Sequence, residues 1–111
     1  MYISGGENVF PGEVESALAA HPEVSEVVVV GTPHSLWGEV GCAFILLKDP
    51  ASVSAPSADE IMAFAKQNLA GYKVPRRVVF LAEFPRLGSG KPDRRALSSQ
   101  APPAEVEKAI L

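Results

Sequence analysis

The sequence is poor in the residues that build covalent or metal-bound frameworks, with one cysteine, two histidines and one tryptophan among 111 residues. A single cysteine excludes an internal disulfide and suits a reducing cytosol, so we expect a cytoplasmic protein. We predict no metal site in this chain. No apolar run approaches the roughly 20 residues of a membrane-spanning helix, so no membrane span is expected. The first residues carry neither a basic segment nor a long apolar one, which argues against a secretory signal.

What remains is an ordinary globular composition, 47% hydrophobic and 21% charged, of the length of one domain. That length allows one modest core but not a full nucleotide-binding domain as well. Cys42 lies inside the apolar run at residues 41–45. We therefore expect a small buried hydrophobic residue there rather than a nucleophile.

Positive charge is concentrated in one stretch of a chain whose net charge is −3. Residues 73–95 hold seven basic and two acidic side chains, a net charge of +5, and the rest of the chain carries three basic and eleven acidic ones, or −8. A local basic stretch on an acidic protein favours a specific anionic partner, so we predict no nucleic-acid binding. The alternative is a solvated face whose charges are balanced by acidic neighbours in space.

The pattern of apolar residues and turn formers predicts the order β-turn-β, α, β, β, α, β, α. A hairpin is expected at the N-terminus, with its turn at residues 5–8, because Gly and Asn tolerate positive φ. The other predicted elements are helices from Pro11 to before Pro22, from Ser57 to Gly71 and over 93–99, with strands over 24–30, 39–48 and 76–81.

The strand at 24–30 is apolar on both faces, which predicts a place in the middle of a covered sheet. Residues 31–38 are predicted to form a loop and residues 72–75 an extended connector. The fold class is α+β: a small mixed β-sheet of about three main strands plus the hairpin, with about three helices packed on it. Residues 1–100 form the predicted domain, and residues 101–111 a mobile tail.

Lys91 lies in the most chemically suggestive stretch, residues 86–95, just after two glycines that flank a serine. Glycine permits a tight turn with unpaired N–H groups, and Pro92 suits the first turn of a helix. The lysine is therefore expected at a flexible loop-to-helix junction. An ammonium, free amides and a helix N-terminus together suit a phosphate or a carboxylate. The alternative is a polar turn before a short surface helix.

Four stretches, in order and spacing, resemble the C-terminal domain of the adenylate-forming enzymes, which include acyl-coenzyme A synthetases, luciferases and peptide-synthetase adenylation domains. They are residues 4–15 (SGGENVFPGEVE), 31–39 (GTPHSLWGE), 72–76 (YKVPR) and 84–95 (FPRLGSGKPDRR). The resemblance covers residues 1 to about 99. The Gly-Gly-Glu-Asn-Val-Phe-Pro segment is similar to the acid–coenzyme A ligase branch, because peptide synthetases usually carry an Arg-containing loop there.

The resemblance implies a two-step reaction. A carboxylic acid and ATP give an acyl-adenylate and pyrophosphate, and the coenzyme A thiol then displaces AMP to form a thioester. It further implies that this chain is a mobile lid, whose partner is a large N-terminal adenylation domain with the phosphate loop, the acid pocket and Mg²⁺. The family's hinge residue lies just before the Ser4-Gly5-Gly6 turn, and the chain starts too late to show it. We expect the isolated chain to bind no cofactor and to be inactive.

The resemblance also assigns roles to residues. Lys91 corresponds to the lysine that lowers the repulsion between carboxylate and α-phosphate in the first step. Gly5, Gly6, Glu7 and Asn8 correspond to the turn that faces the active site in the second step, after the domain rotates, and the glycines permit close backbone approach. The alternative is a structural β-turn with a capping asparagine.

Tyr72 and Lys73 match the family turn that touches the coenzyme A adenine, by ring stacking and by a lysine–phosphate contact. Some relatives have Arg at the position of Val74, so stacking is expected to be weaker here. Trp37 either walls the same region or anchors its loop by packing.

The sequence departs from the family pattern at His34, where Asp is frequent, and at Pro92, which follows the lysine in place of an aliphatic residue and should stiffen the loop. A loop histidine of this kind is expected to be solvent-exposed rather than a base. A second hypothesis is a stand-alone binding module that uses the basic stretch for a nucleotide or an acidic protein.

Overall fold

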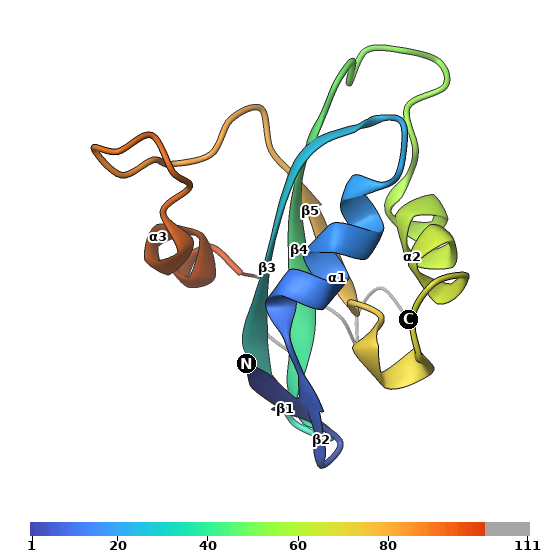
Figure 1. Ribbon diagram of the computed structural model, residues 1–111, viewed down its shortest axis with the longest axis vertical. Helices are drawn as coiled ribbons and strands as arrows, with labels where there is room; N and C mark the ends of the chain where they lie inside the picture. Colours follow the sequence, from blue (N-terminus) through green and yellow to red (C-terminus); the bar gives the residue numbers. More distant parts are fainter. Residues whose placement is uncertain (102–111) are drawn as a thin grey trace.

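The structure is a computed structural model, and it describes residues 1–101. The predicted mobile tail, residues 101–111, lies outside the described residues except for Ala101. The elements of the described part are β1 (Tyr2–Ser4), β2 (Glu7–Val9), α1 (Pro11–Ala19), β3 (Val24–His34), β4 (Gly38–Leu47), α2 (Ala58–Lys66), the 3-10 helix η1 (Gly71–Lys73), β5 (Arg77–Phe80) and α3 (Arg94–Ser99). Figure 1 shows the sheet between α3 on one side and α1 and α2 on the other.

The five strands of the described residues form one mixed sheet, which confirms the predicted fold class. Strand β4 is central: β3 pairs with it along one edge, and β1 and β5 pair with it on the other. The β4–β5 pair is parallel, and the other pairs are antiparallel. The prediction that residues 24–30 lie in the middle of the sheet is therefore wrong, since β3 is an edge strand. Its two apolar faces are nevertheless both covered.

Strand β3 is longer than predicted. It continues through Thr32 and Pro33 to His34, which pairs with Gly38, so only residues 35–37 connect it to β4. The predicted loop at 31–38 is therefore wrong. Proline has no backbone N–H to donate. It is acceptable in β3 because the backbone groups on the outer side of an edge strand pair with no other strand.

Two apolar clusters hold the sheet and helices together. One face of the sheet packs Val29, Ala43 and Ile45 against α1 and α2, with Leu18 and Ile61 fully buried. The opposite face packs Val28, Cys42, Phe44 and Leu46 against Phe84 and against Leu97 of α3. Cys42 is buried, as expected, and burial raises the pKa of its thiol to about 12, so the thiolate is not formed at neutral pH.

Helix α2 begins as predicted but ends early. Ser57 and Glu60 form a capping box at its N-terminus, a feature that typically stabilises a helix by about 1 kcal/mol. The helix ends at Lys66 rather than at Gly71, and residues 71–73 form the 3-10 helix η1. The extended connector predicted at 72–75 is therefore wrong in its first half.

None of the helices within residues 1–101 has the length and apolarity needed to cross a bilayer. Within the same part of the chain, no three side chains of His, Cys, Asp or Glu gather where they could hold a metal ion.

Candidate functional site

The hairpin between β1 and β2 turns at Gly5 and Gly6, as predicted. Their φ angles are +58° and +86°, and Ser4 pairs with Glu7 across the turn. Two positive φ angles in a two-residue loop are typical of a type I′ turn, whose twist matches that of the flanking strands. The turn therefore depends on both glycines for its backbone shape.

Trp37 packs against this turn at Gly5. The N–H of Gly5 donates to the carbonyl of Trp37 at 2.9 Å, and a Cβ added at Gly5 would lie 2.9 Å from Trp37 Cε3. The guanidinium of Arg76 lies 4.9 Å from the centre of the indole ring, within the range of a cation–π contact. Trp37 is thus a packed anchor of its loop, yet 38% of it remains exposed.

Glu7 and Asn8 both lie in β2 and are exposed. Asn8 pairs with Ile3 in the strand ladder, and Phe10 is the N-cap residue of helix α1, so Asn8 does not cap that helix. Within residues 1–101 the side chains of Glu7 and Asn8 make no hydrogen bond, and both are available to a ligand.

Tyr72 and Lys73 lie in η1, which contacts β2. The ammonium of Lys73 is 2.9 Å from a carboxylate oxygen of Glu13 and 5.6 Å from the centre of the Tyr72 ring. The hydrogen bond to Glu13 raises the pKa of Lys73. The positive charge of Lys73 is therefore held beside strand β2.

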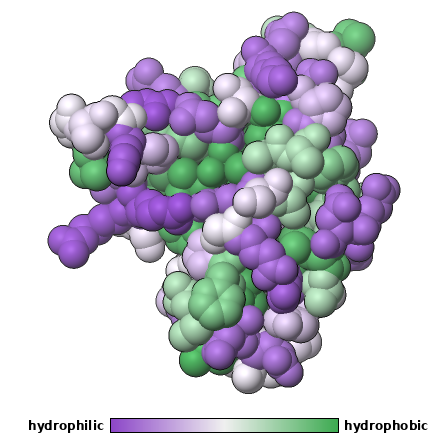
Figure 2. Space-filling view, viewed as in Figure 1, coloured by the Kyte–Doolittle hydropathy of each residue, from purple (hydrophilic) through white to green (hydrophobic). Residues whose placement is uncertain are grey.

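The end of the domain at the β1–β2 hairpin also exposes apolar side chains, some of which are visible at the lower end of Figure 2. Exposed hydrophobic residues near this end are Met1, Ile3, Phe10, Leu36, Trp37 and Tyr72. Single exposed hydrophobic residues are common on protein surfaces, but several around one turn indicate a contact surface.

His34 organises the loop that carries Trp37. Its Nδ1 accepts hydrogen bonds from the backbone N–H groups of Leu36 and Trp37, at 3.1 and 3.2 Å. An aspartate carboxylate can accept the same two bonds. The departure from the family pattern at this position therefore preserves the local turn, and His34 is half-buried rather than fully exposed.

Lys91 follows a closed turn at the other end of the domain. The N–H of Leu87 donates to the carbonyl of Lys91, and the N–H of Gly90 donates to the carbonyl of Leu87, both at 2.9 Å. Gly90 has a φ of +91°, so the turn resembles a three-residue hairpin loop that ends in a glycine bulge. The predicted flexible junction is instead a hydrogen-bonded hairpin.

Pro92 lies outside helix α3, which corrects its predicted place in the first helical turn. It forms an isolated antiparallel bridge with Arg86, and Asp93 is the residue that caps the helix. The side chain of Lys91 is exposed and makes no ion pair or hydrogen bond with any residue in the range 1–101. An ammonium held on a short rigid turn is thus open to an anionic partner.

The basic stretch is partly balanced by acidic neighbours, as its alternative interpretation required. Lys73 pairs with Glu13, and the Nη2 atoms of Arg86 and Arg94 lie 2.5 Å from Glu26 and Glu15. Lys91 and Arg95 have no such pairs in the described chain. Lys91 is therefore an exposed cation of this stretch that no acidic side chain of residues 1–101 neutralises.

The candidate residues fall into two groups, and the segments that carry them lie at opposite ends of the domain in Figure 1. The orange loop before α3 carries Lys91, and the blue β1–β2 hairpin lies at the far end of the sheet beside yellow η1. We call the first group the lysine end and the second the hairpin end, which comprises Gly5, Gly6, Glu7, Asn8, Trp37, Tyr72 and Lys73.

Sequence reasoning missed two arginines that complete these groups. Arg76 covers Trp37 at the hairpin end, and Arg86 contacts both Glu26 and the carbonyl of Gly90 at the lysine end. Both stood inside recognised motifs, but their partners lie 39 and 60 positions away. Only the fold brings these pairs together.

A family model described as "AMP-binding enzyme C-terminal domain" matches residues 13–91. This match covers more than half of the chain, so the chain belongs to that family. The family resemblance drawn from the four motifs is confirmed.

Curated relatives agree with this assignment. The chain is 45% identical over 105 residues to a 2-succinylbenzoate–CoA ligase from Geobacillus kaustophilus, a match that covers 95% of this chain and 21% of the relative. It is 47% identical over 91 residues to a feruloyl-CoA synthase from an Amycolatopsis species, covering 82% and 18%.

A solved fatty acyl CoA synthetase from Mycobacterium tuberculosis has the same fold, with a TM-score of 0.81 and 37% identity over 96% of this chain and 20% of that one. The chain thus spans about a fifth of the length of the relatives it matches. These relatives are ligases rather than small binding modules, which removes support for the stand-alone hypothesis.

Proposed function

We propose that this chain is the mobile C-terminal lid of an ATP-dependent, AMP-forming acyl-CoA synthetase, which we call the parent ligase. The parent ligase activates a carboxylic acid as an acyl-adenylate and transfers the acyl group to coenzyme A. Family membership supports the proposal, and so do the relatives, whose names describe CoA ligases and synthetases.

The observation that carries the proposal is the separation of the lysine end from the hairpin end within one domain. Two chemical steps that need different surroundings can share one active site if a single domain presents its two ends in turn. Each end has the chemistry of one step. The lysine end offers an open positive charge, and the hairpin end offers glycine backbone, aromatic rings and a second cation.

In the adenylation step, two anions must approach each other. The Lys91 ammonium, with no acidic partner in residues 1–101, would stabilise the charge that develops between carboxylate and α-phosphate. A compact charge on a long side chain suits a group that must reach from one domain into another. Lys91 is therefore the proposed catalytic residue.

In the thioester step, the hairpin end would line the path of coenzyme A. Gly5 and Gly6 keep the turn narrow, while Glu7 and Asn8 offer hydrogen-bonding groups to the pantetheine amides. Tyr72, Trp37 and Lys73 would meet the adenine and phosphates.

The surface pair between Lys73 and Glu13 does not prevent this contact, since ion pairs near the solvent contribute little to stability. A phosphate can therefore replace Glu13 as the partner of Lys73 at little energetic cost.

The proposal includes the rest of the reaction. ATP and coenzyme A are substrates, and Mg²⁺, the acid pocket and the phosphate loop belong to an N-terminal adenylation domain that is the partner of this lid. We further propose a cytoplasmic enzyme of fatty acid or related carboxylic acid metabolism. The choice of acid is made in the N-terminal domain.

The test is an assay of the parent ligase against a panel of carboxylic acids that includes 2-succinylbenzoate, ferulate and fatty acids. We expect AMP, pyrophosphate and an acyl-CoA thioester to form together with at least one acid. Removal of residues 1–111 should abolish thioester formation, and the isolated chain should melt cooperatively by circular dichroism yet release no pyrophosphate. ATP-dependent turnover by the isolated chain, or undiminished thioester formation after the deletion, would show that the chain is not the lid.

A further inference from the structure

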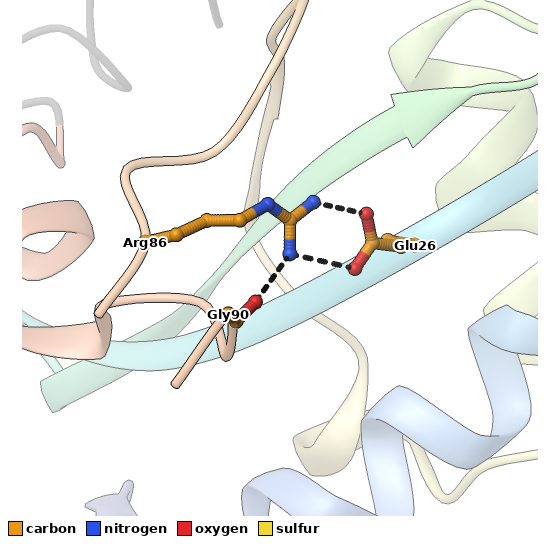
Figure 3. Close-up of polar contacts among 3 residues, drawn as sticks. All are labelled: Glu26, Arg86 and Gly90. Carbon is orange, nitrogen blue, oxygen red and sulfur yellow. Dashed lines mark hydrogen bonds and ion pairs between the residues drawn. The ribbon is translucent and has the colours of Figure 1, made fainter. Parts of the chain in front are cut away.

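Arg86 links strand β3 to the turn that precedes Lys91, as Figure 3 shows. Its Nη1 donates to Glu26 Oε1 at 3.3 Å, and its Nη2 donates to Glu26 Oε2 at 2.5 Å. The same Nη1 also donates to the carbonyl of Gly90 at 3.1 Å. The guanidinium is thus fixed by strand β3 on one side and holds the hairpin turn on the other.

The contact with Gly90 acts directly on Lys91. The Gly90 carbonyl and the Lys91 N–H belong to one rigid, planar peptide unit. Holding that carbonyl therefore sets the plane from which the Lys91 side chain departs. Gly90 has a φ of +91°, and glycine has the widest conformational freedom of any residue type. The hydrogen bond from Arg86 therefore restricts a backbone that glycine alone would leave free.

Strand β3 has a bulge at Ser25 that determines on which face of the sheet Glu26 lies. Val24 pairs with Leu47 and Glu26 with Leu46, so Ser25 is an extra residue in the strand. Such a bulge shifts the alternation of side chains by one position. Val24 consequently packs with Val29 on the α1 face, whereas Glu26 lies on the opposite face, toward the lysine end.

We propose that Glu26 and Arg86 are positioning residues that orient Lys91 for the adenylation step. The proposal rests on the role of Lys91 proposed above. Glu26 anchors the guanidinium, the guanidinium holds the Gly90 carbonyl, and the carbonyl fixes the start of the lysine side chain. Arg86 touches no reacting atom, and its effect passes through the Gly90–Lys91 peptide.

The pair between Arg86 and Glu26 is not expected to act mainly by stabilising the fold. Both side chains are more than a third exposed, and exposed ion pairs contribute little to the free energy of folding. Arg86 differs from an ordinary surface arginine because its fork is bidentate to Glu26 and also reaches a backbone carbonyl, a geometry that lysine cannot reproduce. Arg95 lacks such contacts within the described chain and serves as a control of equal charge.

The experiment measures the two half-reactions separately in the parent ligase. We expect Arg86→Met to lower kcat for adenylation about tenfold to a hundredfold, as misplacement of a catalytic group does. The KM values for ATP and acid should change little, and thioester formation from pre-made acyl-adenylate should stay near the wild-type rate. Arg86→Lys and the isosteric Glu26→Gln should lose part of the rate, and Arg95→Met should lose almost none.

A double variant separates the possible failures. If Arg86 acts through Lys91, Arg86→Met should have no further effect on adenylation in a Lys91→Ala background. An equal loss in both backgrounds, or equal losses from Arg86→Met and Arg95→Met, would overturn the positioning role while the role of Lys91 stands. Normal adenylation by Lys91→Ala alone would overturn both. Thermal melts identify any variant that fails to fold, in which case Glu26→Gln decides.

Discussion

Replacing Lys91 by alanine in the parent ligase should lower the rate of adenylation by about 10²–10³, the usual effect of removing one preorganised charge from a developing anionic centre. The Lys91 ammonium has no structural role in the described part of the chain, since it makes no ion pair with residues 1–101. The turn that carries it is closed by backbone hydrogen bonds, which the substitution leaves intact. The thioester half-reaction and the melting temperature should therefore stay close to those of the wild type.

Pre-made acyl-adenylate provides the decisive comparison for this variant. Supplied to Lys91→Ala together with coenzyme A, it bypasses the damaged step, and thioester release should recover. Arg95→Met is the matched control, because it removes one exposed charge four positions away in α3. A folded Lys91→Ala enzyme that fails the bypass as well would show that Lys91 does not have the proposed role.

The second large effect is expected from Gly6→Leu, which should slow thioester formation about tenfold to a hundredfold and affect adenylation much less. A Cβ at Gly6 has no atom within 4 Å in this domain. The leucine side chain would thus find space in the isolated lid and meet resistance only when the hairpin end docks against the active site. Separate rates for the two half-reactions measure the difference.

Gly6→Ala is the control for the backbone. At a φ of +86° alanine and leucine have the same backbone strain, of order 1–3 kcal/mol. Alanine, however, lacks the large side chain of leucine. The gap between the alanine and leucine variants therefore reports the side chain alone. Gly5 is less suitable, because any Cβ there would collide with Trp37. Equal losses in both half-reactions for Gly6→Leu would mean that the turn is only structural.

The parts of the structure that sequence could predict are those specified locally. Gly5 and Gly6 predicted a tight hairpin turn because few other residues adopt two positive φ angles in succession. Ser57 and Glu60 predicted a helix start because their reciprocal capping bonds span three residues. Lys91 stood out because its neighbours are turn formers.

The wrong predictions share a physical cause, which is pairing between backbone segments that residue preferences alone do not specify. Gly31 and Pro33 looked like a loop, yet strand β3 continues through them because its outer edge has no partner strand to lose. Pro92 looked like a helix start, but its pairing with Arg86 across the turn places it before the cap. The preferences of the individual residues specify neither of these pairings.

The candidate site was predictable to the same extent. The residues of both ends were identified from motifs, and their roles remain predictions. Their division between two ends of one domain required the fold, as did the contacts of Arg76 with Trp37 and of Arg86 with Glu26. The contacts that position a functional group are tertiary, whereas the group itself is often visible in the sequence.

Lysine footprinting of the parent ligase in two trapped states tests most directly whether one domain presents its two ends in turn. An amine-reactive reagent, read by mass spectrometry, would report Lys91 at the lysine end, Lys73 at the hairpin end and the exposed Lys66 of α2 as an internal reference. With ATP bound and the acid withheld, Lys91 should be protected and Lys73 reactive relative to Lys66. With a non-reactive acyl-adenylate analogue and coenzyme A bound, the order should reverse. The same reactivity of Lys91 and Lys73 in both states would contradict alternate presentation of the two ends.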